Sequence, residues 1–434
     1  MKEHRQMIDD KTDSEIDIER SHAEEASGRQ HHEHALASIL GPAFVAVVAY
    51  VDPGNVAANI TSGARYGYLL VWVLVLANAM SVLIQYQSAK LGIVTGKSLP
   101  ELLGERMGNA GRFMFFMQAE VIAIATDLAE VIGGAIALNL LFGLPLFVGG
   151  LVIGAASTVM LWFQGGRTQT TFERIIIVLL LVITFGFIAG LFVAPPDPAA
   201  VVRGLIPRFQ GTDSVLMAAS ILGATVMPHA IYLHSTLVND HYYTHSDKPS
   251  IAMQLKGSKI DVTWALLLAG TVNLAMLVLA ANSLHGMSGT DSIDGAQRAI
   301  TQVLGPVIGT IFSIGLLASS LSSTSVGTYA GSEIMRGLLH VNVPMWACRV
   351  VTLVPALIVL WFAKDPTQAL VIGQVVLSIG IPFAVIPLMR YTHTKELMGE
   401  WVDGTVKHVI FMIVVALIVA LNVLLIVLTI FGRA

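Results

Sequence analysis

Long apolar segments separated by short polar connections fill most of the chain after residue 35. A helix needs about 20 apolar residues to cross the hydrocarbon core of a bilayer. On this criterion the pattern predicts eleven membrane-spanning helices, centred near residues 49, 80, 125, 155, 183, 226, 271, 321, 353, 378 and 419. The hydrophobic pattern therefore predicts an all-α polytopic membrane protein.

Two of these spans contain a polar break near their middle. Asp52-Pro53-Gly54-Asn55 interrupts the first span, and Met227-Pro228-His229 interrupts the sixth. A carboxylate at the membrane midplane costs about 2.5 to 3.5 kcal/mol, and a proline inside a helix about 3 kcal/mol. A packing kink explains a proline alone, and a turn between two short helices is the other alternative. Because the flanking runs are too short to span separately, the breaks favour two unwound helices that form a binding site.

The positions of the breaks also predict an inverted repeat. The break in the sixth span follows the break in the first by five spans. Because five is odd, the two halves of the chain cross the membrane in opposite directions. We expect repeat one at about residues 36–195, repeat two at about 212–391 and an additional helix at about 407–431. The predicted connections on one side carry thirteen Lys and Arg residues and those on the other six, so the N-terminus is predicted to be cytoplasmic and the C-terminus extracytoplasmic.

Composition supports this class and adds a separate N-terminal tail. The chain is 55% hydrophobic and 12% charged, with a mean hydropathy of +0.73, whereas globular proteins are about 25% charged. Residues 1–35 hold fifteen of the fifty-four charged residues, so the net charge of −4 belongs to the tail and indicates no nucleic-acid partner. The tail lacks signal-peptide features and is predicted to be disordered and cytoplasmic, although His31-His32-Glu33-His34 is also suited to capturing metal. Cys348 is the only cysteine, which excludes an intrachain disulfide.

The breaks present ligands for a transition-metal ion. Unwinding frees carbonyls one turn earlier, near Ala49 and Ala224, while Asp52 and Asn55 add a carboxylate and an amide oxygen. Oxygen alone suits a hard cation, but the thioether of Met227 favours late first-row divalent ions. A methionine in an apolar helix is more often core filler, and its position beside a proline break argues against that interpretation here.

Further polar groups lie in other spans. Glu120, Asp127 and Glu130 fall within about 80° on one face of the third span, and Arg349 in the ninth is their predicted partner. The predicted proton pathway contains Asp52, Asp127, Glu130, Glu120, Arg349, His229 and His234. A static ion-pair network that fixes helix packing is the alternative, above all for Glu120 with Arg349. Gln374 either adds an amide oxygen to the metal site or makes a packing hydrogen bond.

At these positions the sequence resembles the Nramp family of proton-coupled divalent metal transporters, whose bacterial members include manganese importers. The two broken motifs match those of the family's first and sixth helices, and the segment Ser322-Ser323-Thr324-Ser325-Val326-Gly327-Thr328-Tyr329-Ala330-Gly331 resembles its eighth helix. The resemblance covers residue 36 to the last span. One departure is Cys348-Arg349, where members often carry two adjacent arginines.

The resemblance implies a LeuT-type fold in a bacterial plasma membrane, with metal ligands at Asp52, Asn55, Met227 and the carbonyls of Ala49 and Ala224. It also implies a proton route from Asp52 through Asp127 to Glu130 and Arg349, with His229 beside the ion. Mn2+ or Fe2+ is then the substrate, imported with protons by alternating access, and no cofactor is expected. Pro53, Gly54, Gly223 and Pro228 are the predicted hinges. Retention of Met227 argues against the magnesium- and aluminium-transporting relatives as templates.

Three other function classes compete with this prediction. A cation-coupled amino-acid symporter shares the architecture, but its broken helices usually offer bare backbone to a substrate carboxylate. An intramembrane hydrolase lacks support because neither His-Glu-x-x-His nor Gly-x-Ser-x-Gly occurs. A channel is compatible with the composition, but it does not explain two broken helices.

Overall fold

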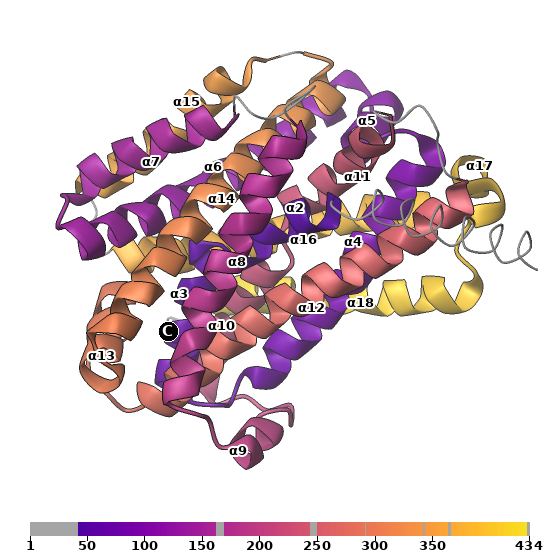
Figure 1. Cartoon of the computed structure of the whole chain (residues 1–434). Coiled ribbons are helices and arrows are strands. Elements are labelled where there is room, and N and C mark those ends of the chain that lie inside the picture. The colour runs from indigo at the N-terminus through magenta and orange to yellow at the C-terminus, as the bar shows by residue number, and fades with distance from the viewer. Residues whose placement is uncertain are drawn as a thin grey trace, which may run out of the picture.

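The computed structural model describes residues 42–161, 169–243, 250–290, 292–341, 343–362 and 366–431, and within these ranges every regular element is a helix (Figure 1). The tail at 1–35, including His31-His32-Glu33-His34, lies outside the described residues. The spans are α2 (Pro42–Val47) with the 3-10 helix η1 (Val48–Val51) and α3 (Pro53–Tyr66), α4 (Val71–Thr95), α6 (Asn109–Phe142), α7 (Leu146–Leu161), α8 (Gln169–Val193), α10 (Gly211–Thr225) with α11 (Pro228–Tyr243), α12 (Ile251–Ser283), α14 (Pro306–Leu339), α15 (Met345–Phe362), α16 (Pro366–Thr392) and α18 (Thr405–Phe431).

These helices occupy the positions of the eleven predicted spans. Eight segments are long and apolar enough to cross a membrane, and the segments 42–51 and 53–66 form a ninth span bent by 47°. The remaining two, α7 and α15, are shorter apolar helices of 16 and 18 residues. The prediction of an all-α polytopic membrane protein is therefore confirmed.

Four short α-helices lie in the described connections, α5 (Leu99–Arg106), α9 (Pro198–Arg203), α13 (Ile293–Leu304) and α17 (Lys395–Met398), and the 3-10 helix η3 (Gly399–Trp401) follows α17. The hydropathy pattern did not predict them, because they are too short and too polar to resemble spans. Local sequence explains α5, which starts with a capping box: Ser98 accepts from the backbone N–H of Glu101, whose carboxylate accepts from the backbone N–H of Ser98.

Small residues allow the central helices to approach closely. In the interior, α6 packs along α14, α3 lies against α12, and α10 lies against α16 (Figure 1). A Cβ atom added to Gly133 of α6 would lie 2.1 Å from Cβ of Pro53, so this glycine admits the proline that starts α3. Membrane helices associate through such close contacts, because lipid provides no hydrophobic driving force between them.

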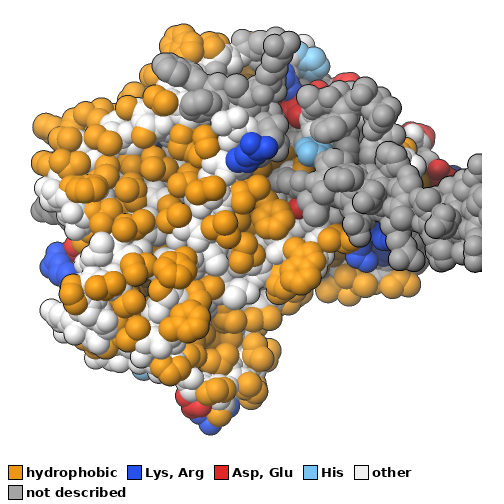
Figure 2. All heavy atoms as spheres, in the orientation of Figure 1, with side chains coloured by type: hydrophobic (Ala, Val, Ile, Leu, Met, Phe, Trp, Pro, Cys, Tyr) orange, Lys and Arg blue, Asp and Glu red, His pale blue; other side chains and the backbone are white. Residues whose placement is uncertain are grey.

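The molecular surface has the character expected of contact with lipid. Figure 2 shows a face covered largely by hydrophobic side chains, with few charged groups among them. Large apolar side chains are exposed on the spans, including Phe185, Phe192 and Trp361. A water-exposed surface of this extent is unusual for a monomeric soluble protein, so a multi-pass membrane protein is the consistent interpretation.

Candidate functional site

The first break lies at Asp52, between η1 and α3. The backbone of Asp52 is extended, and its side chain caps α3: Oδ1 accepts from the backbone N–H of Asn55 at 2.8 Å and from Asn55 Nδ2 at 2.9 Å. Pro53 fits the first helical position because the N–H it lacks would have no intrahelical acceptor there. The sequence Asp-Pro-Gly-Asn thus starts a new helix inside the span.

The second break consists of Val226 and Met227, between α10 and α11. Pro228 starts α11 and cannot donate to the carbonyl of Ala224, four residues earlier, just as Pro53 cannot donate to Ala49. The Ala224 carbonyl instead accepts from Asn55 Nδ2 at 2.6 Å. The two predicted interruptions are confirmed, and one side chain joins them.

Several acceptor atoms at this junction are buried without a hydrogen-bond partner. They include Oδ2 of Asp52, Oδ1 of Asn55 and the side-chain amide oxygen of Gln374. Gln374 reaches the junction from α16, since a Cβ atom at Gly54 would lie 1.7 Å from its Nε2 and 2.9 Å from Asp52 Oδ2. Met227 is fully buried at the second break. Buried oxygen atoms normally have a partner, so this cluster is suited to a ligand that supplies positive charge.

Neighbouring helices hold the unwound backbone before the first break. Asn273 of α12 donates to the Tyr50 carbonyl at 2.7 Å, and Ser319 of α14 donates to the Val51 carbonyl at 2.5 Å. Asn59, one turn after Asn55 in α3, donates to Oδ1 of Asn273 at 3.1 Å. Hydrocarbon offers no alternative partner to such carbonyls, so these side chains stabilise the break.

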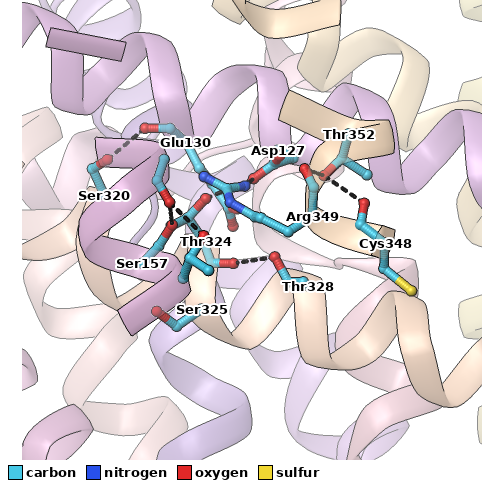
Figure 3. A network of polar contacts seen from close by, with 12 residues as sticks. Asp127, Glu130, Ser157, Ser320, Thr324, Ser325, Thr328, Cys348, Arg349 and Thr352 are labelled. Atoms are coloured by element: carbon cyan, nitrogen blue, oxygen red, sulfur yellow. Dashed lines mark hydrogen bonds and ion pairs between the residues drawn. The ribbon is translucent and has the colours of Figure 1, made fainter. Parts of the chain in front are cut away.

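An ion pair lies beside the junction, between α6 and α15. Figure 3 shows Asp127 and Arg349 pointing toward one another. Oδ1 of Asp127 accepts from Arg349 and, at 2.6 Å, from Thr324 of α14, while its Oδ2 has no partner. Arg349 is only 1% exposed, and its Nε and Nη2 atoms are also without acceptors. Asp127 is thus the intramembrane partner of Arg349.

Glu130 lies one turn from Asp127 and is completely buried. Neither carboxylate oxygen has a hydrogen-bond partner, although the backbone carbonyl accepts from Ser320 at 2.5 Å (Figure 3). One turn beyond Glu130 on α6, Gly133 lies against Pro53, next to Asp52. Glu130 therefore connects the junction with the ion pair.

The two predicted histidines flank the junction on α11. His229 contacts Oγ1 of Thr126 through Nδ1 at 3.4 Å, and its Nε2 has no partner. Nδ1 of His234 lies 2.8 Å from Oε1 of Gln85, whose Nε2 donates to the Tyr50 hydroxyl at 2.6 Å. His234 is therefore connected to η1 through α4.

Glu120 differs from the other predicted titratable residues in its burial. It is partly exposed and lines a small pocket that also contacts Asp127. Within the described ranges, Arg349 makes its ion pair with Asp127 and none with Glu120. Glu120 thus has no part in the ion pair of Arg349, and the alternative of a static network that fixes helix packing stays a prediction for Asp127 and Arg349.

Sequence reasoning missed the residues that support the site. Asn273, Ser319, Thr324 and Gln85 were not predicted as partners of the breaks or of the ion pair. Their signal was present, since amides and closely spaced hydroxyls in apolar spans need acceptors. What the sequence did not reveal was which acceptor each one meets.

Two helices broken at equivalent positions of five-span halves, with an eleventh helix, define a multi-pass membrane transporter of the LeuT-type inverted-repeat fold. A nucleobase-cation-symport-1 family transporter shares this fold, with a TM-score of 0.60 at 16% identity over 90% of this chain and 91% of that one. The chain belongs to the Nramp family: the model for natural resistance-associated macrophage protein-like sequences matches residues 43–428.

Relatives support the assignment over nearly the full chain. The "Divalent metal cation transporter MntH" of Mycobacterium tuberculosis is 54% identical over 394 residues, which are 91% of this chain and 92% of that protein. Its namesake from Deinococcus radiodurans is 42% identical over 385 residues, 88% of each chain. Among solved structures, the Eremococcus coleocola manganese transporter bound to an aromatic bis-isothiourea compound matches with a TM-score of 0.80 at 29% identity, over 91% of this chain and 86% of that one.

Proposed function

We propose that the chain imports Mn2+, Fe2+ and similar divalent transition-metal ions into the cytoplasm, coupled to protons, by alternating access. One observation carries the proposal: buried, unpartnered oxygen atoms of Asp52 and Asn55 lie where the two helix breaks are joined. The relatives are named as divalent metal cation and manganese transporters, which supports the same substrate class.

The proposed ligands combine hard and soft donors. Asp52 supplies a carboxylate, Asn55 an amide oxygen, Met227 a thioether, and Ala49 and Ala224 carbonyls. The carbonyl oxygen has a second lone pair, so Ala224 can keep its bond from Asn55 and still face an ion. Gln374 contributes its amide oxygen from α16. A mixed set of this kind binds Mn2+ and Fe2+ and disfavours Ca2+, which takes only oxygen.

Proton coupling follows from the carboxylate at the site. Asp52 must be deprotonated to bind a cation, so metal binding displaces its proton. The proposed route leads from Asp52 toward Glu130 and Asp127, with Arg349 beside them and His229, His234 and Glu120 as further titratable groups. Because Glu130 lies on α6 between Asp127 and the contact with Pro53, a proton on one of these groups changes the charge felt by the next.

In the proposed cycle, the halves of the broken spans move relative to the rest of the bundle. Pro53, Gly54, Gly223 and Pro228 remain the predicted hinges. With the N-terminus cytoplasmic and the C-terminus extracytoplasmic, metal enters from outside a plasma membrane and leaves into the cytoplasm. An amino-acid substrate is not favoured, since the Asp52 carboxylate would repel a substrate carboxylate.

The test is Mn2+ uptake by the purified full chain in proteoliposomes under an inward proton gradient. Met227→Ala should still carry Mn2+ but discriminate poorly against Ca2+, whereas Met276→Ala, which removes a buried thioether from α12, should keep its selectivity. Unchanged selectivity in Met227→Ala overturns the thioether as a ligand. Titration calorimetry with Mn2+ and with amino acids separates the two substrate classes.

A further inference from the structure

A small pocket between α6, α14 and α15 has no part in the metal site at the helix breaks. Glu120 and Asp127 line it from α6, Met335 from α14 and Cys348 from α15. Its volume of about 10 Å³ is close to the roughly 10 to 15 Å³ needed by one water molecule. The pocket therefore has room for a single water molecule or a single ion.

Two sulfur atoms of the described lining lie at a distance that one metal ion can bridge. Sγ of Cys348 and Sδ of Met335 are 3.9 Å apart, and both residues are buried. Two sulfurs bound to one ion at about 2.3 Å each lie about 3.8 Å apart at a tetrahedral angle. An ion can therefore bind both without a rearrangement of the helices.

Carboxylate side chains also line the pocket and can supply oxygen ligands. Asp127 is 3% exposed, and its Oδ2, which has no hydrogen-bond partner, belongs to a side chain that lines the pocket. Glu120, which also lines the pocket, is only partly buried. Because Asp127 is paired with Arg349, Glu120 is the carboxylate that makes the pocket favourable for a cation.

The pocket lies near helix ends that meet at one connection. Cys348 is the fourth residue of α15, and Met335 precedes the end of α14 at Leu339 by about one turn. In the proposed orientation this connection is cytoplasmic. An ion can thus arrive from the cytoplasm without passing the metal site at the breaks.

We propose that Cys348 and Met335, with Glu120 as an oxygen ligand, form a second metal site, specific for a soft, thiophilic ion of the Cu+ type, whose occupation inhibits transport. Thiolate and thioether ligands together select such ions. The Cys348 thiol loses its proton to solvent on binding, so the net charge is unchanged, but the ion fills the pocket lined by Asp127, the partner of Arg349. Since that pair lies on the proposed proton route, the inhibitory part rests on the proposed function.

Binding is tested first, independently of transport. The probe is Ag+, a soft monovalent ion that needs no reductant, titrated into the purified full chain while thiolate-to-metal absorbance is followed. We expect one Ag+ per chain in this signal, its loss in Cys348→Ser, and an affinity at least about tenfold lower in Met335→Leu. Met398→Leu, the same change at a buried methionine of α17, is the matched control and should bind as the unmodified chain does.

The second readout is Mn2+ uptake in proteoliposomes with Ag+ on the inside. Half-inhibition should require at least about tenfold more Ag+ in Cys348→Ser than in the unmodified chain. Inhibition of Cys348→Ser at the unmodified concentration, or equal affinity in Met335→Leu, overturns the site. If the unmodified chain binds Ag+ through Cys348 but takes up no Mn2+, the result contradicts the proposed function and still supports the sulfur site.

Discussion

The side-chain amide of Asn55 donates to the main-chain carbonyl of Ala224 across 2.6 Å, and so joins the two broken helices. Ala224 lacks its helical donor because Pro228 has no N–H, and Asn55 lies in the first turn after the other break. A defect in one half of the molecule is therefore satisfied by a residue from the other half. This bond uses only the amide nitrogen, so Oδ1 stays free for an ion.

We expect Asn55→Ala to impair both the junction and the binding of Mn2+. The change leaves the Ala224 carbonyl unpaired, at a cost of about 1 to 3 kcal/mol, and removes one proposed ligand. Mn2+ affinity, measured by titration calorimetry, should fall at least about tenfold. Asn59→Ala, the same change one turn along α3, removes the bond to Asn273 but no proposed ligand, so it should lower the melting temperature without a comparable loss of affinity. Equal losses in the two variants would contradict a ligand role for Asn55.

The two predicted hinge glycines should differ in their response to alanine. At Gly223 the new Cβ would lie 2.1 Å from the Gln374 backbone carbonyl, so α10 and α16 must separate. At Gly54 it would meet the flexible end of the Gln374 side chain instead. Gly223→Ala should therefore lower the melting temperature strongly, in line with overpacking costs of about 1 to 3 kcal/mol. Gly54→Ala should cost less stability and mainly reduce Mn2+ affinity by displacing Gln374.

A matched variant separates packing from site effects at these glycines. Gln374→Ala removes the clash at Gly54 but leaves the backbone carbonyl opposite Gly223 in place. It should recover the melting temperature of Gly54→Ala and give no recovery in Gly223→Ala. Equal recovery of the melting temperature in both variants would contradict the proposed difference, in which Gly54 contacts the side chain of Gln374 and Gly223 contacts its backbone.

The sequence was sufficient to predict the spans and both breaks, because hydropathy and proline chemistry are local properties. The partners of the breaks were not predictable in the same way. Asn273 and Ser319 are more than two hundred residues from the carbonyls they bind, and only packing of α12 and α14 against η1 brings them there. For the same reason the sequence did not determine which of Glu120, Asp127 and Glu130 pairs with Arg349, and in the structure the partner is Asp127.

Mn2+ binding should release a proton, and the affinity should rise with pH. The carboxyl group of Asp52 binds either a proton or the ion, so a lower pH favours the protonated form and weakens metal binding. Titration calorimetry in two buffers with different ionisation enthalpies measures the protons released per ion. Asp52→Asn should abolish both the release and most of the binding. Asp213→Asn, which neutralises an exposed carboxylate at the start of α10, should change neither.

Removing one partner of the buried Asp127–Arg349 ion pair should destabilise the protein more than neutralising both partners together. Removing one partner strands the other charge in the interior, with an expected loss of about 3 to 5 kcal/mol. Arg349→Gln and Asp127→Asn should therefore each lower the melting temperature strongly, while the double variant should recover much of it. Thr324→Val, which removes only the hydroxyl donor to Asp127, should cost less. In proteoliposomes the double variant should still bind Mn2+ at the intact junction but move fewer protons per ion. Unchanged proton movement in that variant would place the proton route elsewhere and leave the pair a structural element of the bundle.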